Sequence, residues 1–245
     1  MKKIVIIGAN DFQNQLILKA KEMGFETHVF AWQDGSIGER TADYFYPVSI
    51  VEIDEILEKC KEIKPDAVAT IASDLANITV SKVAAGLGLP GNTPECIEIS
   101  TNKYAMRSAF LKAGIPTPAF YKVDQVQDEL YKMKLPAIVK PTDRSGSRAI
   151  TKITDFKDLE GAIQDAVEQS FEKKAIVEEY IEGNEYSYET ISYRGKHTNL
   201  AVTKKYTTGA PHFIETGHCE PSDLSKETLE KVHKTMYAAL DALKI

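Results

Sequence analysis

The chain has 245 residues, of which 43% are hydrophobic and 27% are charged, an ordinary composition for a globular protein of one or two domains. Its 30 Lys and Arg residues against 36 Asp and Glu residues give a net charge of -6, so the composition supplies no basic field to attract nucleic acid or an anionic membrane. The apolar runs are far shorter than the roughly 18 residues of a membrane-spanning helix, and residues 1–3 lead directly into a strand pattern without a signal peptide. We therefore expect a cytoplasmic protein that binds neither nucleic acid nor membranes.

Short β-rich runs alternate with helical patterns in the first third of the chain. The expected strands are residues 3–7, 26–31 and 67–71, and the expected helices are residues 12–23, 53–63 and 75–87. This alternation predicts a parallel sheet whose loops gather at one edge, where ligands bind in such folds. Asp74, just after the third strand, is favoured as a helix N-cap over a ligand-facing carboxylate. The breaker-rich segment 87–94 predicts the end of a first domain at residue 93.

The pattern changes in the rest of the chain. Two helices are expected over residues 94–100 and 102–113, followed by two strand–helix units over residues 119–169 that predict a small lid. Antiparallel strands are then expected at residues 175–180, 185–193, 199–205 and 212–218, before a helix over residues 225–243. We assign residues 94–245 to a second domain, with the lid over about residues 119–180.

Two familiar kinds of site are disfavoured by spacing. Gly8 follows a strand as in a dinucleotide-binding fold, but the second and third glycines of G-x-G-x-x-G are absent, so an NAD site is disfavoured. The metal-ligand residue types near the C-terminus are His212, Glu215, His218, Cys219 and Glu220. On a strand, Cys219 would point away from the two histidines, so a transition-metal site is disfavoured as well. The three cysteines fit no disulfide or zinc pattern and are expected to be buried thiols.

A cation and a small-residue loop lie together in the middle of the chain. Lys140 ends an expected strand, because the proline that follows it prevents the strand from continuing. The loop over residues 142–148 contains Ser145, Gly146 and Ser147, whose backbone N–H groups can surround phosphate oxygens. A solvated hairpin turn explains this loop equally well.

An acidic connector joins two expected strands over residues 176–189. Its extended backbone can supply the hydrogen-bond acceptor and donor that an adenine base needs. Glu185, seven residues past Glu178, is placed to accept hydrogen bonds from ribose hydroxyl groups. The alternative is a plain acidic hairpin.

Taken together, the segment that begins at Lys103, the end of the strand at Lys140 with its loop, and the connector from Glu178 to Glu185 closely resemble the ATP-grasp superfamily. Residues 8–93 also resemble the pre-ATP-grasp domain of that superfamily, so the resemblance covers nearly the whole chain. It implies an α/β fold with an N-terminal parallel sheet, followed by an ATP-grasp domain built from a small lid and an antiparallel sheet.

The resemblance also implies roles for individual residues. Three lysines match cations that hold nucleotide phosphates and serve catalysis: Lys103, Lys140 and Lys205. The other matching residues form the phosphate-covering loop, the adenine hinge and the ribose contact: Ser145, Gly146, Ser147, Glu178, Glu179, Tyr180, Ile181 and Glu185.

The implied activity is that of a ligase which uses ATP and Mg²⁺ to form an acyl-phosphate from a carboxylate and to join it to an amine or related nucleophile. The Glu215-Thr-Gly-His-Cys-Glu-Pro221 stretch is similar to one in amino-acid-ligase-like members, whereas a carbamoyl-phosphate-synthetase-like enzyme with a bicarbonate substrate stays open. The alternative is a nucleotide-binding module without catalysis.

The chain also departs from the superfamily pattern. Members hold magnesium with carboxylates on strands that follow a helix like residues 225–243, and this sequence stops at Ile245. We therefore name no metal ligand. We expect a piece of a longer protein, or one product of a split gene, that binds ATP without turning it over. An uncovered sheet edge in such a piece would favour a homodimer.

Overall fold

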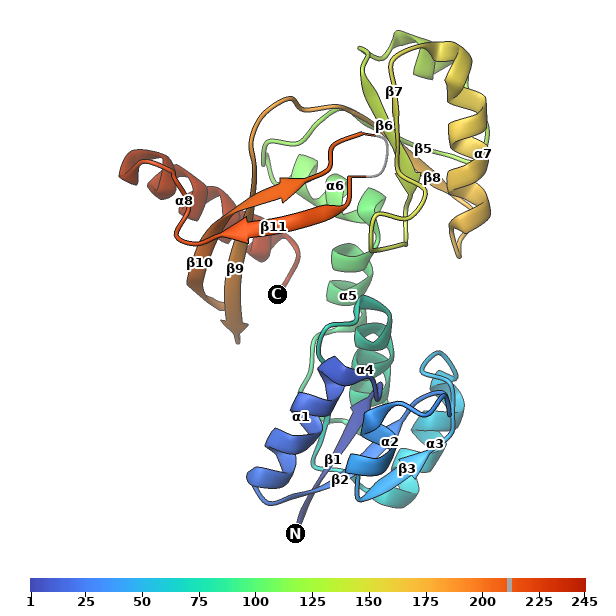
Figure 1. The fold of residues 1–245 in the computed structure, drawn as a ribbon, viewed down its shortest axis with the longest axis vertical. Helices are drawn as coiled ribbons and strands as arrows, with labels where there is room; N and C mark the ends of the chain where they lie inside the picture. The colour runs from blue at the N-terminus through green and yellow to red at the C-terminus, as the bar shows by residue number, and fades with distance from the viewer. Residues whose placement is uncertain (211–212) are drawn as a thin grey trace. The chain divides into compact units, whose positions relative to one another are not determined.

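A computed structural model describes residues 1–210 and 213–245 of the chain. The chain divides into two compact units, Met1–Glu98 and Ile99–Ile245, and each unit is described by itself below (Figure 1). The order of elements confirms the expected α/β fold, with a parallel sheet first and antiparallel sheets after it.

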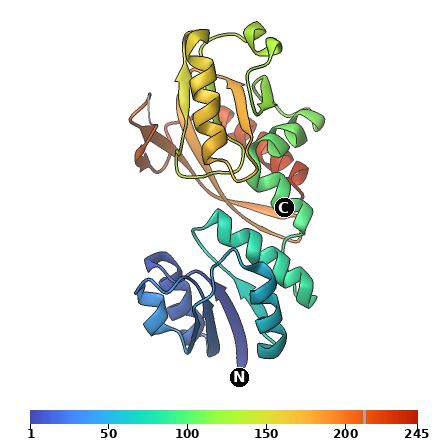
Figure 2. The same cartoon turned by 90° about the vertical axis from the view of Figure 1, so that its right-hand side faces the viewer.

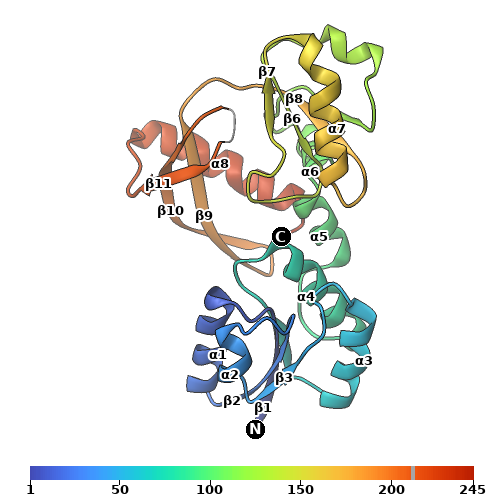
Figure 3. The same cartoon turned by 45° about the vertical axis from the view of Figure 1, so that its right-hand side comes forward.

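The first unit is built on a four-stranded parallel sheet with the order β3-β2-β1-β4. Its strands are β1 (Lys2–Ile7), β2 (Phe25–Phe30), β3 (Tyr44–Tyr46) and β4 (Ala67–Ala69), and its helices are α1 (Asp11–Glu22), α2 (Ile37–Thr41), α3 (Ile53–Ile63) and α4 (Asp74–Leu87). Side chains alternate across β1, so Ile4 and Ile6 pack towards α1 while Val5 and Ile7 pack towards α3 and α4. Helices cover both faces of the sheet (Figure 3), which explains why residues 4–7 of β1 form a continuous apolar run.

Local signals place the helix ends in this unit. Asn10 caps α1, since its side chain accepts hydrogen bonds from the backbone N–H groups of Phe12 and Gln13. The sequence interpretation of Asp74 as an N-cap is wrong. The side chain of Ser73 caps α4 by accepting a hydrogen bond from the N–H of Ala76. Asp74 is the first residue of the helix, where a negative charge interacts favourably with the helix dipole.

Strand β3 and helix α2 are absent from the sequence prediction because each is too short to show a period. A side chain next to β3 ties this edge strand to the sheet. Asp43 accepts hydrogen bonds from the N–H of Thr27 at 2.9 Å and from its hydroxyl at 2.8 Å, and it pairs with Lys21 at 2.7 Å. The hydrogen bond from Lys21 is the main reason that the pKa of Asp43 falls to about 2.

Replacing Asp43 by Asn should lower the free energy of unfolding by roughly 1–2 kcal/mol at pH 7, because hydrogen bonds to a charged acceptor are lost. The folded state lowers this pKa from 3.8, so the stabilisation is present above pH 3.8 and is lost as the pH falls towards 2. Urea unfolding at pH 7, 4 and 3 should therefore show a narrowing gap between the two proteins. A gap that stays constant with pH would contradict this account.

Helix α5 (Pro94–Thr101) spans the sequence boundary of the two units, and the second unit continues with α6 (Lys103–Lys112) into a four-stranded sheet, here called the lid sheet, with the order β5-β8-β6-β7. Its strands are β5 (Phe120–Val123), β6 (Ala137–Pro141), β7 (Thr151–Ile153) and β8 (Ala175–Glu179), and all pairs are antiparallel. Helix α7 (Leu159–Gln169) covers one face (Figure 2). The expected helix near residues 124–133 is only a 3-10 turn, Asp128–Lys132.

A three-stranded antiparallel sheet with the order β11-β10-β9 completes the second unit. Its strands are β9 (Glu185–Tyr193), β10 (Lys196–Thr207) and β11 (Glu215–Cys219). Helix α8 (Lys226–Ala242) packs on one face, where His233 hydrogen-bonds the hydroxyl of Tyr188 at 2.7 Å. Within the described residues, no helix is both long and apolar enough to cross a bilayer.

Candidate functional site

A buried carboxylate with two cations lies where β8, β6 and α6 meet. Glu178 on β8 is only 4% exposed. One of its oxygens, Oε1, accepts a hydrogen bond from Nζ of Lys140 on β6, and the other, Oε2, accepts from Nε of Arg107 on α6 at 3.0 Å. Burial raises the pKa of Glu178, but the charges of Lys140 and Arg107 outweigh it, so the pKa lies below its ordinary value. Glu178 is therefore ionised at neutral pH.

The start of α6 is anchored to the loop that follows β6. Asn102 caps the helix, and the N–H of Lys103 donates to the carbonyl oxygen of Thr142 at 2.7 Å. The Nζ of Lys103 donates to the carbonyl oxygen of Arg144 in the same loop. Lys103 and Arg107 are four residues apart and so share one face of α6. That face of α6 thus presents two cations to β6, to β8 and to the loop that follows β6.

The small-residue loop after β6 has an unusual backbone. Gly146, Ser147 and Ala149 have φ angles of 72°, 54° and 49°, in the left-handed region that side-chain-bearing residues rarely adopt. The hydroxyl of Ser147 donates to the carbonyl oxygen of Phe213 at 3.1 Å, which links the loop to a residue just before β11. Left-handed residues set among right-handed ones are the backbone pattern from which anion-binding nests of N–H groups are built.

The expected hinge leaves the lid sheet at the end of β8. The N–H groups of Glu179 and Tyr180 donate to the carbonyl oxygens of Ala119 and Pro136, at 2.9 Å and 3.1 Å. The next residue, Ile181, is 64% exposed. The ring of Tyr180 also lies under the ammonium group of Lys152, which is 3.6 Å from the ring centroid.

The third expected lysine is paired as well. Nζ of Lys205 on β10 lies 3.0 Å from a carboxylate oxygen of Glu185 on β9 and 2.8 Å from one of Glu215 on β11. Burial lowers the pKa of Lys205, but the hydrogen bonds with Glu215 and Glu185 outweigh it, so the pKa lies above its ordinary value. The hydrogen bond from Lys205 likewise lowers the pKa of Glu215. Expected catalytic and ribose-binding residues thus lie next to each other on this sheet.

Arg107 is absent from the residues selected from the sequence. Glu215 is selected only in the disfavoured metal set and in the stretch similar to amino-acid-ligase-like members, and not as a partner of Lys205. Arg107 carried one usable signal, its spacing of four residues from Lys103 on a predicted helix. Glu215 pairs with Lys205 only through the register of β10 and β11, which is irregular between Tyr206 and Thr207.

The structure also bears on the disfavoured sites. Cys219 pairs with Lys204 and His218 with Lys205, so the two residues point to opposite faces of the sheet, and His212 lies outside the described residues. Across residues 1–210 and 213–245, no three His, Cys, Asp or Glu side chains gather as a cation site. Cys60 and Cys96 are buried as expected, but Cys219 is exposed, because it lies on β11 at the edge of its sheet.

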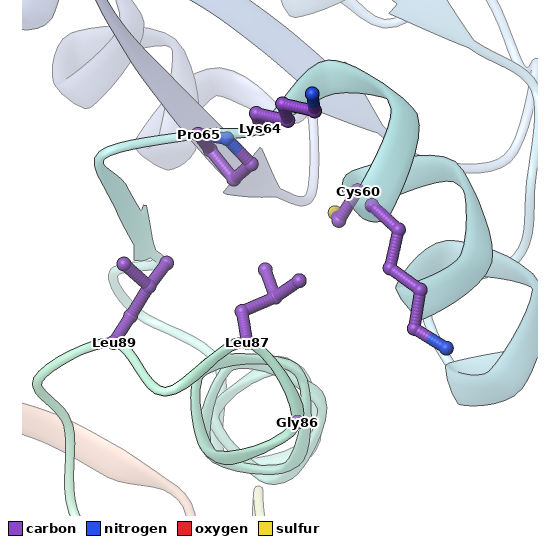
Figure 4. Close-up of a pocket in the computed structure, with 7 residues that line it drawn as sticks. Cys60, Lys64, Pro65, Gly86, Leu87 and Leu89 are labelled. Carbon is purple, nitrogen blue, oxygen red and sulfur yellow. The ribbon is translucent and has the colours of Figure 1, made fainter.

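A hollow of about 370 Å³ in the first unit lies between α3 and α4 (Figure 4). Its lining includes Cys60, Lys64, Leu87 and Leu89 and contains none of the expected site residues. Burial raises the pKa of Cys60 to about 12, so this thiol stays protonated at neutral pH.

Comparison with known proteins identifies the family. A sequence model of the ATP-grasp domain matches residues 133–245. An L-amino acid ligase from Bacillus licheniformis is 26% identical in sequence to this chain, and its crystal structure superposes on this structure with a TM-score of 0.86. The superposition covers 100% of this chain and 61% of the ligase chain. Residues 133–245 belong to the ATP-grasp superfamily. This confirms the resemblance drawn from the sequence motifs.

Other ATP-grasp relatives differ in how much they share with this chain. An alanine–anticapsin ligase from Bacillus subtilis strain 168 is 28% identical over 217 residues, which cover 78% of this chain and 45% of the relative. A biotin carboxylase domain from Hydrogenobacter thermophilus, solved with MgADP, shares the fold with a TM-score of 0.82 at 18% identity, over 99% of this chain and 58% of its own. The chain thus spans less than half the length of the curated ligase.

Proposed function

We propose that this chain is the nucleotide-binding part of a ligase that uses ATP to join a carboxylate to an amine or related nucleophile through an acyl-phosphate. The single observation that carries the proposal is the buried group of Lys140, Glu178 and Arg107 beside the loop of residues 142–148. A carboxylate buried as deeply as that of Glu178 must be paired. Its two partners are cations next to a loop whose backbone suits an anion. The similarity to an L-amino acid ligase supports the same conclusion.

In this proposal the lysines neutralise charge. Attack of a carboxylate on a phosphoryl group brings two anions together, so fixed cations stabilise the transition state more than the separated reactants. Lys103, Lys140 and Lys205 take that role. Ser145, Gly146 and Ser147 cover the phosphates, and a closed lid excludes the water that would hydrolyse an acyl-phosphate.

The remaining expected residues form the nucleoside end of the proposed site. The backbone of Glu178 and Glu179 meets the adenine amine, Tyr180 and Ile181 supply further hinge backbone, and Glu185 binds the ribose. The domain assignment belongs to the same proposal, with a pre-ATP-grasp domain over residues 1–93 and a partial ATP-grasp domain over residues 94–245.

The proposal includes both ATP and Mg²⁺. The described residues offer groups for the phosphates of ATP, but they offer no clear set of ligands for Mg²⁺. The cations of α6 and β6 fit a polyphosphate. We assign no magnesium ligand, because the described residues bring together no cluster of carboxylates and histidines for one. Mg²⁺ bound with ATP would neutralise phosphate charge and orient the transferred group.

An amino acid is the substrate class that we favour. Glu215 lies in the stretch similar to that of amino-acid-ligase-like members, and its carboxylate is held ionised by Lys205 at 2.8 Å. An ionised carboxylate next to the proposed phosphate cations suits an incoming ammonium group. Bicarbonate is the competing substrate.

Phosphate release from MgATP tests the proposal. The 245-residue chain would be assayed with pooled L-amino acids, with bicarbonate, and with neither. Release that depends on amino acids supports the ligase and the favoured substrate class, whereas release that depends on bicarbonate supports the competing one. Binding of ADP without release under any condition would favour the alternative, a nucleotide-binding module. Absence of ADP binding would contradict the proposal.

The ribose contact gives a separate prediction. Replacing Glu185 by Gln should weaken ATP binding by about tenfold, since a hydrogen bond to a charged acceptor contributes roughly 1.5–3 kcal/mol and the amide retains part of it. Binding of the 2′,3′-dideoxy analogue should change much less. Titration calorimetry of both nucleotides would measure this, with Glu182→Gln, an exposed change in the same connector, as the control. Equal losses for both nucleotides would instead indicate a structural role through Lys205.

A further inference from the structure

The pairing of Lys140 raises a question about its proposed role, because the nitrogen that must reach a phosphate is already bound to Glu178. Lys140 has a side chain 16% exposed, and the Glu178 side chain is 6% exposed. A lysine that left a carboxylate this deeply buried would leave an uncompensated charge, which is strongly unfavourable. Glu178 would then compete with the nucleotide for Lys140.

Arg107 removes this conflict. It approaches from α6, whereas Lys140 approaches from β6, and the two cations take different oxygens of the same carboxylate. The group therefore holds two positive charges and one negative charge. One cation can leave while the other keeps Glu178 paired, and Arg107 is anchored through Nε on a helix whose N-terminus is tied to the loop after β6.

We propose that Arg107 is a positioning residue that keeps Glu178 neutralised when Lys140 turns from this carboxylate to the nucleotide phosphates. The inference rests on the proposed nucleotide function. Arg107 acts through Glu178 and need not touch the nucleotide. Without Arg107, Glu178 would retain Lys140, and nucleotide affinity would fall although every proposed phosphate ligand is still present.

Calorimetry with ADP on four proteins tests the inference: the wild type, R107M, R107K and the double variant R107M/E178Q. We expect R107M to weaken ADP binding at least tenfold. R107K, which keeps a cation beside Glu178, should stay within about threefold of the wild type. The double variant should recover most of the loss, because the neutral amide introduced by E178Q no longer holds Lys140. A direct contact of Arg107 with phosphate predicts the opposite, since removing the charge of Glu178 could not restore a lost ligand.

A second measurement needs no nucleotide. Acetic anhydride would modify the lysines under limiting conditions, and mass spectrometry would follow Lys140 against the exposed Lys112 on α6 as an internal reference. Lys140 should react several-fold more slowly in R107M than in the wild type and regain its reactivity in R107M/E178Q. Circular dichroism of each variant establishes that the fold is retained.

The outcomes separate the two proposals. ADP binding by R107M that equals the wild type, a double variant as weak as R107M, or unchanged Lys140 reactivity would each overturn the role of Arg107. If the wild type binds no ADP, the proposed function fails, and the reactivity of Lys140 still decides whether Arg107 shares Glu178 with it.

Discussion

Replacing Lys140 by Met should weaken ADP binding by ten- to a hundred-fold. A charge-assisted contact with phosphate contributes roughly 1.5–3 kcal/mol, and methionine keeps the aliphatic stem while removing the charge. The fold should persist, because Glu178 keeps its second partner, Arg107, at 3.0 Å. Titration calorimetry with ADP, together with a urea unfolding curve, would measure both effects. Lys140→Ala should show the same loss of affinity.

The control for Lys140 removes an equal charge elsewhere. Lys112 lies exposed at the end of α6, so Lys112→Met changes the net charge by the same amount without touching Glu178. Its ADP affinity should equal that of the wild type at moderate salt, where exposed charges are screened. If Lys140→Met binds ADP as tightly as Lys112→Met does, Lys140 is removed from the proposed site and the ion pair with Glu178 is purely structural.

Much of the fold could be predicted because its signals are local. The apolar run of β1 follows from burial on both faces, and helix α3 has the expected bounds, Ile53–Ile63. The elements that escaped prediction depend on distant partners. Strand β3 is three residues long and is held by Asp43 against Thr27 of β2, a contact that no sequence window contains.

The candidate site divides in the same way. The end of β6 near Lys140 is visible in the sequence because Pro141 cannot donate to a further strand. The ion pairs of Glu178 are not visible in the sequence, because Glu178 lies 38 residues from Lys140 and 71 residues from Arg107 along the chain. Their meeting depends on the antiparallel register of β6 with β8 and on the packing of α6, which are properties of the folded chain.

A change of one methyl group should destabilise the first unit strongly. Gly38 in α2 is buried, its N–H donates to the carbonyl oxygen of Ala9 at 2.9 Å, and an added Cβ would meet that oxygen at 2.6 Å and the Ala9 Cα at 2.9 Å. Backbone cannot swing aside as a flexible side chain can. Gly38→Ala should therefore lower stability by roughly 2–3 kcal/mol, because the overpacking cost exceeds the gain of about 1 kcal/mol in helix propensity.

Gly161 offers the matched control for this prediction. It also lies within a helix, α7, but an added Cβ there meets nothing within 4 Å. Gly161→Ala should stabilise the second unit by roughly 0.5–1 kcal/mol, since alanine loses less conformational entropy in a helix. Two units need not unfold together, so hydrogen exchange followed by mass spectrometry is the suitable measurement. Exchange should accelerate in β1 and α1 of Gly38→Ala and slow in α7 of Gly161→Ala. Unchanged protection around Ala9 in Gly38→Ala would mean that α2 can move away from the turn after β1, so that this turn is not fixed by close backbone packing.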